Sequence, residues 1–543
     1  MNIKHIENSF NVSSDKKSSI AKHGIVASAF PNATKAGVEM LKKGGNAVDA
    51  ACATALALGV CEPQASGIGG QSMVILYING KTIAIDGSSR SPSLAHSSLF
   101  QKRRSRLLGY KATTVPSTLA VIGYLHEKYG KLEWPKIVSP SIRIAKHGYK
   151  ITKLQHGLQV RELSNFMKIK SKSGARYFLK DGQVPYDIGD KFIQTDLADT
   201  LHSISVHGYR SFYHGQIAKT IHNDMIKNQG LIRAEDMALV PEPIERKPIN
   251  RYYRKINIVT LPPPAAGRTL LLTMMMLNHL PSKFLRSSKP ISYHFVAETF
   301  RKAFLHRVQR PFNPRTYHQT TDTVHLSRSF AKQMADSIHN TMDATLPMVD
   351  PDFGGEDTTH LSVMDREGNA VGITQSIELA YGSKAAADGL GFLYNNYMSA
   401  FEFENPNHPY YIRPNAVPWT SVSPSCVFYN GKLWMVVGSP GSQRIFSTIT
   451  HFLSRMIDGD LPMNEAIQRP RFHCSIGGTI SYEDGGFDQN TLNYLTRIGY
   501  TIAKKDRLSF YHGAIHAVLK CQTNEGFQGV AEIRRDGTAE GLD

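Results

Sequence analysis

Residues 357–374 read DTTHLSVMDREGNAVGIT, and the interpretation of the whole chain starts from them. The stretch contains two apolar runs around the polar sequence DREGN, a pattern typical of a β-hairpin. Two adjacent threonines, Thr358 and Thr359, stand at the start of the first run. A threonine hydroxyl needs a base to act as a nucleophile, and a threonine at a new chain start carries one, its own α-amino group of pKa about 7.7–8.0. Considered alone, a Thr-Thr pair at the start of a strand is typical of ordinary β-structure.

Motifs elsewhere in the chain bear on that threonine pair. In chain order they are GIVAS from position 24, LKKGGNAVDAA from 41, SGIGG from 66, FYHG from 212, GLIRAED from 230, LPPP from 261, GFLYNNYM from 391, TSVSP from 420, GSPGS from 438 and PRFH from 470. As an ordered set they resemble the γ-glutamyltranspeptidase family of the N-terminal nucleophile hydrolase superfamily, over about nine-tenths of the chain. The resemblance implies a precursor that cuts itself between Asp357 and Thr358.

The secondary-structure pattern favours an α+β fold. Asn79-Gly80 and Asn430-Gly431 each separate two apolar runs, which predicts hairpins with type I′ turns. Residues 115–230 are mainly helical in pattern, and strands mixed with outer helices favour sheets packed between helical layers. The resemblance specifies that arrangement as a four-layer αββα sandwich.

The resemblance also divides the chain into two fragments. Residues 23–357 are expected to form a large subunit and residues 358–543 a small subunit, interwoven in one core as a heterodimer. Residues 346–357, rich in Pro, Asp and Gly, are the expected exposed linker before the cut. Residues 1–22 are polar and are expected to form a disordered tail.

Composition limits the other functional classes. The 543 residues are 41% hydrophobic and 20% charged, as in a globular protein with an ample core. No apolar run reaches the roughly 18 residues of a membrane helix, and the N-terminus lacks a signal-peptide pattern, which predicts a cytoplasmic protein with no membrane partner. The five cysteines are scattered, and none of the 22 histidines falls in a ligand-spaced cluster, so we expect reduced thiols, no metal and no cofactor.

The net charge of +18 raises the question of acidic partners. The densest basic cluster, KRRSR at residues 102–106, is short and lacks interleaved aromatics, so no nucleic-acid partner is expected. We interpret the cluster as a solvated basic face that aids solubility, with attraction of an anionic substrate as the alternative.

Several positions match the catalytic residues of the family. By resemblance, Thr358 is the nucleophile, and Ser376 stands where the family has a threonine whose hydroxyl bonds that nucleophile. Gly441-Ser442 matches a Gly-Gly pair whose backbone amides hold the oxyanion. Because backbone donors are indifferent to the side chain, Ser442 is tolerated there unless that residue needs a positive φ.

The carboxylate subsite departs from the family pattern and makes the chain a divergent member. Thr420-Ser421 match a Ser-Ser pair that helps grip the substrate α-carboxylate, and both hydroxyls remain. The family's arginine for the same carboxylate corresponds to Ser88 in this chain. Arg90 lies two residues further on, and side chains two apart on a strand share a face, so Arg90 is the candidate replacement.

The ammonium subsite departs as well. The family's asparagine that helps hold the α-ammonium corresponds to Glu378, and an acidic residue of the family corresponds to Ala400. Glu378 is therefore a candidate ammonium partner, or part of a pocket built for another substrate. Its negative charge would favour an amine and repel a poorly neutralised carboxylate.

These residues predict a self-processing amide hydrolase or acyltransferase that forms an acyl-enzyme on Thr358 and passes the acyl group of a small-molecule amide to water or an amine acceptor. Because the family's charged partners are altered, we expect a substrate other than glutathione. Two alternatives stay open. One is an ordinary γ-glutamyl hydrolase or transpeptidase acting on glutathione or other γ-glutamyl amides, and the other is an inactive binding protein that retains the fold.

Overall fold

The computed structural model describes all residues of the chain except 241, 314–315, 318–321 and 344–356. The expected linker at residues 346–357 therefore lies, but for Asp357, outside the described residues.

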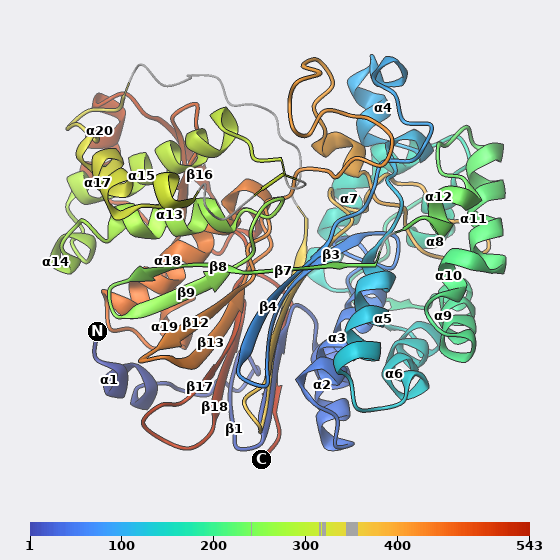
Figure 1. The fold of residues 1–543 in the computed structure, drawn as a ribbon, viewed down its shortest axis with the longest axis horizontal. Coiled ribbons are helices and arrows are strands. Elements are labelled where there is room, and N and C mark those ends of the chain that lie inside the picture. The colour runs from blue at the N-terminus through green and yellow to red at the C-terminus, as the bar shows by residue number, and fades with distance from the viewer. Residues whose placement is uncertain (241, 314–315, 318–321, 344–356) are drawn as a thin grey trace.

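Two seven-stranded antiparallel sheets form the centre of the described structure (Figure 1). Sheet A has the spatial order β1 (Ser18–Ala21), β18 (Phe527–Ala531), β17 (His516–Lys520), β13 (Lys432–Gly438), β12 (Ser425–Tyr429), β9 (Ile256–Thr260) and β8 (Ile249–Tyr253). Sheet B has the order β19 (Thr538–Gly541), β2 (Gly24–Ser28), β10 (Thr359–Asp365), β11 (Ala370–Ser376), β3 (Gln71–Ile78), β4 (Lys81–Gly87) and β7 (Ile244–Arg246).

The parts of the chain before and after Thr358 are interwoven in both sheets, as the sequence predicts. In sheet B, β10 pairs with β2 on one side and β11 on the other, and β11 pairs in turn with β3. In sheet A, β12 pairs with β9 and β18 pairs with β1. Neither part can complete a sheet alone, so both belong to one core.

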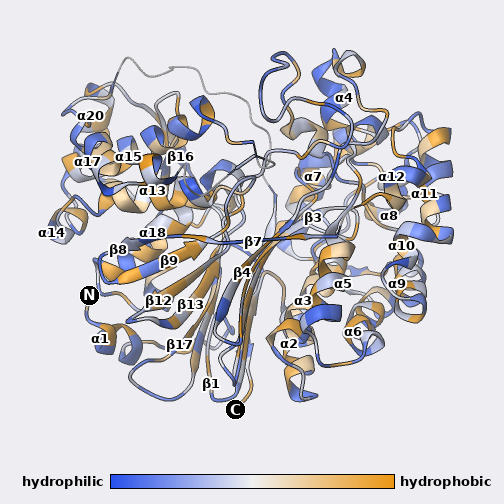
Figure 2. Ribbon diagram, in the orientation of Figure 1, coloured by the Kyte–Doolittle hydropathy of each residue, from blue (hydrophilic) through white to orange (hydrophobic). Residues whose placement is uncertain are grey.

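Helices cover the outer face of each sheet, which gives the four-layer αββα sandwich (Figure 1). The layer on sheet B is built mainly from α2 (Pro31–Lys42), α3 (Ala47–Cys61), α5 (Thr118–Tyr129), α6 (Trp134–His147), α7 (Lys153–Met167), α9 (Thr195–His207) and α11 (Gln216–Lys227). The layer on sheet A is built mainly from α13 (Gly267–Leu277), α15 (Pro290–Gln309), α17 (Arg328–Asp336), α18 (Ile445–Ile457) and α20 (Gln489–Arg497). Figure 2 shows the hydrophobic residues concentrated along the central strands between these layers.

Local sequence signals explain several of these boundaries. Asn79 and Gly80 have φ values of 50° and 77°, and Asn430 and Gly431 have 47° and 77°, the paired positive values of a type I′ turn. Both predicted hairpins are therefore confirmed. The break between α2 and α3 follows from Asn46, whose side chain accepts hydrogen bonds from the first backbone amides of α3.

Residues 1–22 do not form the disordered tail predicted from their polar composition. They contain helix α1 (Ile3–Asn8) and strand β1, which completes one edge of sheet A. Ile6 and Phe10 are spaced four residues apart and are both buried. The average polarity of the segment concealed these two apolar anchors, which fix it to the core.

Two smaller sheets complete the strands of the described residues. One contains β14 (Phe472–Cys474), β15 (Thr479–Glu483) and β16 (Thr501–Lys505), and the other contains β5 (Tyr149–Lys150) and β6 (Lys191–Phe192). In the described part of the chain, no helix combines the length and apolarity needed to cross a bilayer.

Candidate active site

Thr358 and Ser376 meet at one end of the β10–β11 hairpin. The register pairs Thr359 with Gln375, so the residue before Thr359 lies beside the residue after Gln375. The hydroxyl oxygens of Thr358 and Ser376 are 3.2 Å apart, and both side chains are buried. The hairpin predicted from residues 357–374 is thus what brings these two hydroxyls together.

The carbonyl oxygen of Asp357 lies between these hydroxyls. It is 2.8 Å from the Thr358 hydroxyl and 3.0 Å from the Ser376 hydroxyl. The Ser376 hydroxyl also accepts a hydrogen bond from the backbone amide of Glu378 at 2.8 Å. That amide donor leaves the serine proton free to point at a neighbouring oxygen.

Gly70 allows its own loop to pack directly against the backbone of Ser376. A Cβ atom placed on Gly70 would lie 2.2 Å from the carbonyl oxygen of Ser376, far inside van der Waals contact. The SGIGG motif is therefore a close-packing turn next to the site.

Arg535 holds the other side of the Asp357–Thr358 peptide. Its Nη1 donates to the carbonyl oxygen of Thr358 at 3.0 Å and pairs with the carboxylates of Asp357 at 3.2 Å and Glu62 at 3.3 Å. The guanidinium group is buried and lies over the ring of Phe510, 4.2 Å from its centroid. One cation thus fixes both residues of the peptide that the sequence predicts to be cut.

Two carboxylates share this one buried guanidinium. Burial raises the pKa of Asp357 to about 6 and that of Glu62 to about 7, and the charge of Arg535 opposes both shifts. Sequence reasoning missed Arg535 and Glu62. The available signal for Glu62 was an acidic residue directly after the apolar run of α3, whereas nothing local to Arg535 indicates its contact with a residue 177 positions away.

Gly441 and Ser442 form the turn between β13 and α18. Gly441 has a φ of 127° and Ser442 a φ of 53°, so the serine adopts a left-handed conformation. The sequence-based condition for a tolerated serine is therefore not met, because a non-glycine residue in this region costs about 1 kcal/mol or more. The side chain of Ser442 lines the same cavity as Thr358.

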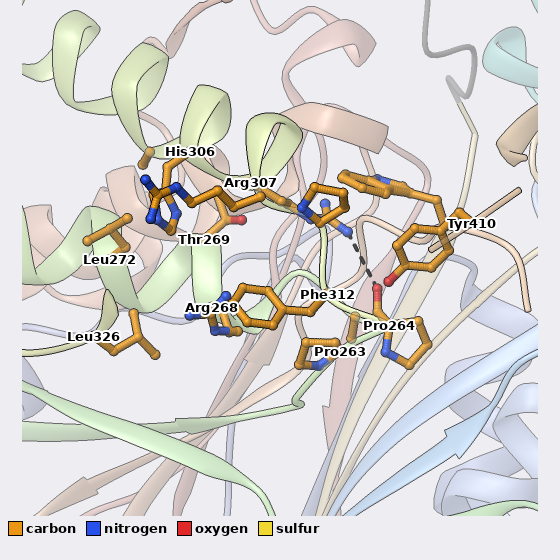
Figure 3. A pocket seen from close by; sticks show the side chains of 15 residues that line it. Pro263, Pro264, Arg268, Thr269, Leu272, His306, Arg307, Phe312, Leu326 and Tyr410 are labelled. Carbon is orange, nitrogen blue, oxygen red and sulfur yellow. Dashed lines mark hydrogen bonds between the residues drawn. The ribbon is translucent and has the colours of Figure 1, made fainter. Parts of the chain in front are cut away.

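Thr420 and Ser421 line that cavity from the loop before β12. Arg307 supports the loop. It donates to the carbonyl oxygen of Thr420 and stacks over Trp419, 4.1 Å from the ring centroid. It also donates to the carbonyl oxygen of Pro264 at 3.4 Å (Figure 3). Burial lowers the pKa of Arg307 to about 10. Arg307 therefore holds the backbone of the loop that carries Thr420 and Ser421.

Arg90 is not among the residues that line this cavity, so its expected role in place of the family's arginine stays a prediction. The argument from alternating side chains requires a continuous strand, but β4 ends at Gly87 and Arg90 lies beyond it, in an isolated bridge with Val115. Ser88, at the family's arginine position, is turned inward and donates to a carboxylate oxygen of Asp86 at 2.6 Å.

The cavity has a volume of about 310 Å³. Five of the predicted residues lie around it, namely Thr358, Glu378, Thr420, Ser421 and Ser442. Aromatic side chains that sequence reasoning missed supply much of the wall, among them Tyr397, Phe401, Tyr410 and Trp419. Polar and apolar side chains share the lining about equally, so the cavity could both hydrogen-bond and pack against a small molecule.

Glu378 contributes less negative charge than the sequence suggests. Burial raises its pKa to about 8, so the carboxyl group is mainly protonated at neutral pH. The residue also has a φ of 80°, a strained conformation for a non-glycine residue directly after the Ser376 turn. A neutral carboxyl group can donate a hydrogen bond but is a poor partner for an ammonium group.

Arg106 also lines the cavity, which corrects the interpretation of the KRRSR cluster as entirely solvated. It lies on the short helix α4 (Arg103–Leu107), half-buried, with its guanidinium carbon 3.9 Å from the centroid of the Phe403 ring. Residues 102–104 of the cluster are exposed. The alternative of an interaction with an anionic substrate is thus the one that the position of Arg106 favours.

The αββα sandwich and a buried threonine at the start of a central strand define the class of protein, the N-terminal nucleophile hydrolases. A model of the family "Gamma-glutamyltranspeptidase" matches residues 33–542. The chain therefore belongs to the γ-glutamyltranspeptidase family, and the family, fold and enzyme class predicted from the sequence are confirmed.

Relatives of two kinds resemble this chain. A glutathione hydrolase proenzyme of Escherichia coli (strain K12) is 31% identical over 509 residues, which is 90% of this chain and 87% of the relative. An acylase ACY 1 proenzyme of Pseudomonas sp. (strain V22) is 28% identical over 96% of this chain and 94% of the relative. The crystal structure of a cephalosporin acylase from Bacillus halodurans superimposes with a TM-score of 0.88, 25% identity and 98% coverage of both chains.

Proposed function

We propose that this chain cleaves itself between Asp357 and Thr358 and then acts as an amide hydrolase or acyltransferase through the new N-terminal threonine. The observation that carries the proposal is the placement of the Thr358 and Ser376 hydroxyls 2.8 Å and 3.0 Å from the carbonyl oxygen of Asp357. The products would be a large subunit of residues 23–357, preceded by residues 1–22, and a small subunit of residues 358–543, held together as a heterodimer by the shared sheets.

In the first reaction the Thr358 hydroxyl attacks the carbonyl carbon of Asp357. The C–N bond breaks, the peptide becomes an ester on the threonine oxygen, and the nitrogen takes up the proton as a free amine. Water then opens the ester and leaves Asp357 with a terminal carboxylate. Arg535, which already contacts both residues, holds the scissile group and neutralises the new negative charge.

In the second reaction the same hydroxyl attacks the substrate amide, with the free α-amino group of Thr358 as the base. The backbone amides of Gly441 and Ser442 stabilise the oxyanion, and such a donor contributes about 2.7–4 kcal/mol at the transition state. Thr358 then carries the acyl group, which water or an amine acceptor removes. Ser376 remains beside the nucleophile through its hydroxyl contact.

We infer that the substrate is an acyl amide other than glutathione. The cavity has no arginine at the family's position and carries a mainly protonated Glu378, so a γ-glutamyl group would lack the charged partners that the family provides at these two positions. The acylases among the similar proteins support this choice. The glutathione hydrolases support the second candidate, a γ-glutamyl hydrolase or transpeptidase.

Two measurements test the proposal. Denaturing electrophoresis with N-terminal sequencing of the smaller band should give two fragments, the second starting at Thr358. The kcat/KM for glutathione should then be lower than for an amide whose acyl group lacks one of the two charges. A single uncut chain without turnover would instead support the binding protein, and faster turnover of glutathione would support the second candidate.

A further inference from the structure

A second cavity, with a volume of about 30 Å³, lies next to the active-site cavity (Figure 3). Tyr410 and Trp419 line both cavities and form the wall between them. Helices α13 and α15 also line the second cavity, together with Phe312. A cavity needs about 10–15 Å³ to hold one water molecule, so the second cavity has room for a single small ion or for water.

Three polar groups that line the second cavity are buried and have no hydrogen-bond partner among the described residues. They are Nη2 of Arg268, the hydroxyl group of Thr269 and Nε2 of His306. The whole residues Arg268 and Thr269 are 9% and 2% exposed. Buried polar groups in folded proteins are nearly always hydrogen-bonded, so three unpartnered groups around one cavity point to a ligand inside it.

All three groups can donate a hydrogen bond. A guanidinium nitrogen has no acceptor capacity, a hydroxyl group can turn its proton toward the cavity, and a neutral imidazole can carry its proton on Nε2. A water molecule would accept from such donors but must also place two hydrogens of its own, and none of the described residues that line the second cavity is acidic. An anion accepts from every donor and has no hydrogen to place. The donors therefore favour an anion over water.

The charge around the second cavity is positive. Arg268 pairs with Asp322 through Nε at 2.6 Å, which leaves its Nη2 without a partner among the described residues. Arg307 and Arg310 also line the cavity, and neither forms an ion pair with a carboxylate in the described part of the chain. Burial and the charge of Arg268 lower the pKa of His306 to about 4, so its imidazole is neutral at physiological pH. One bound anion would offset part of this surplus positive charge.

Arg268 is held in position before any ion arrives. Its guanidinium carbon lies 3.6 Å from the centroid of the Phe312 ring, and Asp322 fixes the Nε side of the group. Thr269 is the next residue along α13, and His306 lies on α15, which packs against α13. Donors that are already ordered reduce the entropy lost on binding.

We propose that the second cavity binds one small inorganic anion of halide size, with chloride as the physiological candidate, through Arg268, Thr269 and His306. A tetrahedral oxyanion such as phosphate needs room for four oxygens and does not fit a cavity of about 30 Å³. Bound there, the ion links α13 to α15 and stabilises the folded protein. This inference goes beyond the proposed function and is independent of it, because Thr358 does not line the second cavity.

Bromide detects an anion in the second cavity directly. It is close to chloride in size, and its anomalous X-ray scattering distinguishes it from water. A crystal of the full chain soaked in sodium bromide should show an anomalous peak in the second cavity, in contact with Nη2 of Arg268 and the hydroxyl group of Thr269. Water in that place, without an anomalous peak, would overturn the proposal.

Thermal unfolding tests the same site in solution. Sodium chloride is titrated against sodium gluconate at constant ionic strength, so that general screening stays the same. An ion that binds only the folded protein raises Tm as its concentration exceeds Kd. The Tm of the wild-type protein should therefore rise with chloride concentration.

The matched variants are Thr269→Val and Thr273→Val. Valine at position 269 keeps the shape of the side chain and removes one donor to the ion, so the chloride concentration needed for a given rise in Tm should increase about tenfold. Thr273 lies one turn further along α13, is also buried, bonds the carbonyl oxygen of Thr269 and does not line the second cavity. Its variant should keep the wild-type chloride dependence.

Arg310→Gln is a second variant of the site that leaves the core untouched, because Arg310 is an exposed residue at the edge of the cavity. It removes one positive charge and should shift the chloride dependence severalfold in the same direction as Thr269→Val. If the wild-type protein and both site variants respond equally to chloride, the proposal is wrong, even where bromide is seen, since the crystal then shows binding at crystal concentration only. A wild-type Tm that does not respond to chloride leads to the same conclusion.

Discussion

The hydroxyl of Ser376 lies 3.0 Å from the carbonyl oxygen of Asp357, across the hairpin from the residue that would be cut. The same oxygen is 2.8 Å from the hydroxyl of Thr358. A carbonyl contacted by two hydroxyls is polarised, and one of the two is positioned to become the nucleophile. The β10–β11 register, rather than any loop, sets this relationship.

Replacing Thr358 by alanine should leave one uncut chain without amidase activity, because the variant lacks the attacking oxygen. Electrophoresis and mass spectrometry measure the cut, and an anilide assay measures the activity. Thr359→Val is the matched control, since valine keeps the shape and strand preference of the neighbouring threonine. If Thr359→Val also fails to cut, or if the Thr358→Ala chain is still cut at this bond, Thr358 is not the nucleophile.

Replacing Ser376 by alanine should slow both self-cleavage and turnover, because the hydroxyl beside the nucleophile and the Asp357 carbonyl is lost. Loss of proton-transfer support typically costs about 10²- to 10⁴-fold in rate. Ser376→Thr restores the hydroxyl and should be mild. Time courses of cleavage after expression, and kcat of the mature enzyme, provide the measurement. Unchanged kinetics in the alanine variant would reduce Ser376 to a structural residue of β11.

The sequence predicts those parts of the site that depend on local pattern. Thr358 and Ser376 meet because a hairpin joins them, and a hairpin is readable from alternation and turn residues. The direction of the Arg90 side chain could not be predicted in this way, because the strand argument was extended past Gly87, where β4 ends. The protonated state of Glu378 depends on burial by other parts of the chain, which no local pattern reveals.

Arg535 should be a positioning residue for self-cleavage. Arg535→Lys keeps the positive charge, but the lysine nitrogen lies one bond closer to the backbone than Nη1, the atom that contacts Thr358, Asp357 and Glu62 at once. We expect self-cleavage to slow by about tenfold or more and the protein to lose about 1–3 kcal/mol of stability. Cleavage time courses and thermal unfolding of the uncut chain measure the two effects separately.

The adjacent Arg534 is the matched control for that prediction. It is equally buried but pairs with Glu483 and Glu532, away from the scissile peptide. Arg534→Lys should therefore lower stability without a comparable loss of cleavage rate. If both variants lose cleavage in proportion to stability, the contribution of Arg535 is to folding alone.

The pKa of Glu378 predicts a pH-dependent selectivity. This pKa is raised from 4.5 to about 8 by burial, so the side chain is neutral below about pH 8 and negative above it. A negative charge in the cavity repels a carboxylate on the acyl group but not a methyl group. Glutaryl 4-nitroanilide ends in a carboxylate and pentanoyl 4-nitroanilide in a methyl group. The ratio of their kcat/KM values, glutaryl to pentanoyl, should therefore fall severalfold as pH rises through about 8, and Glu378→Gln should keep the ratio flat.

The ratio of the two kcat/KM values reports the titration of Glu378 separately from that of neighbouring groups. The α-amino group of Thr358 also loses a proton near this pH, but it affects both anilides equally and cancels. The pKa values of Glu402 and His408 are both lowered, so Glu402 stays negative and His408 stays neutral across this range. Glu402→Gln is accordingly the control that should retain the pH dependence.

The raised pKa of Glu378 also predicts that its contribution to the stability of the folded protein falls as pH rises. Between pH 4.5 and about 8 the folded protein holds a proton on Glu378 that the unfolded chain releases, so this side chain contributes less stability as pH rises. Relative to wild type, Glu378→Gln should gain about 1–3 kcal/mol between pH 4 and pH 8 in denaturant titrations of the Thr358→Ala chain. Using the uncut chain avoids subunit dissociation. A stability difference that does not change with pH would show that Glu378 titrates normally, and the selectivity argument would then lose its basis.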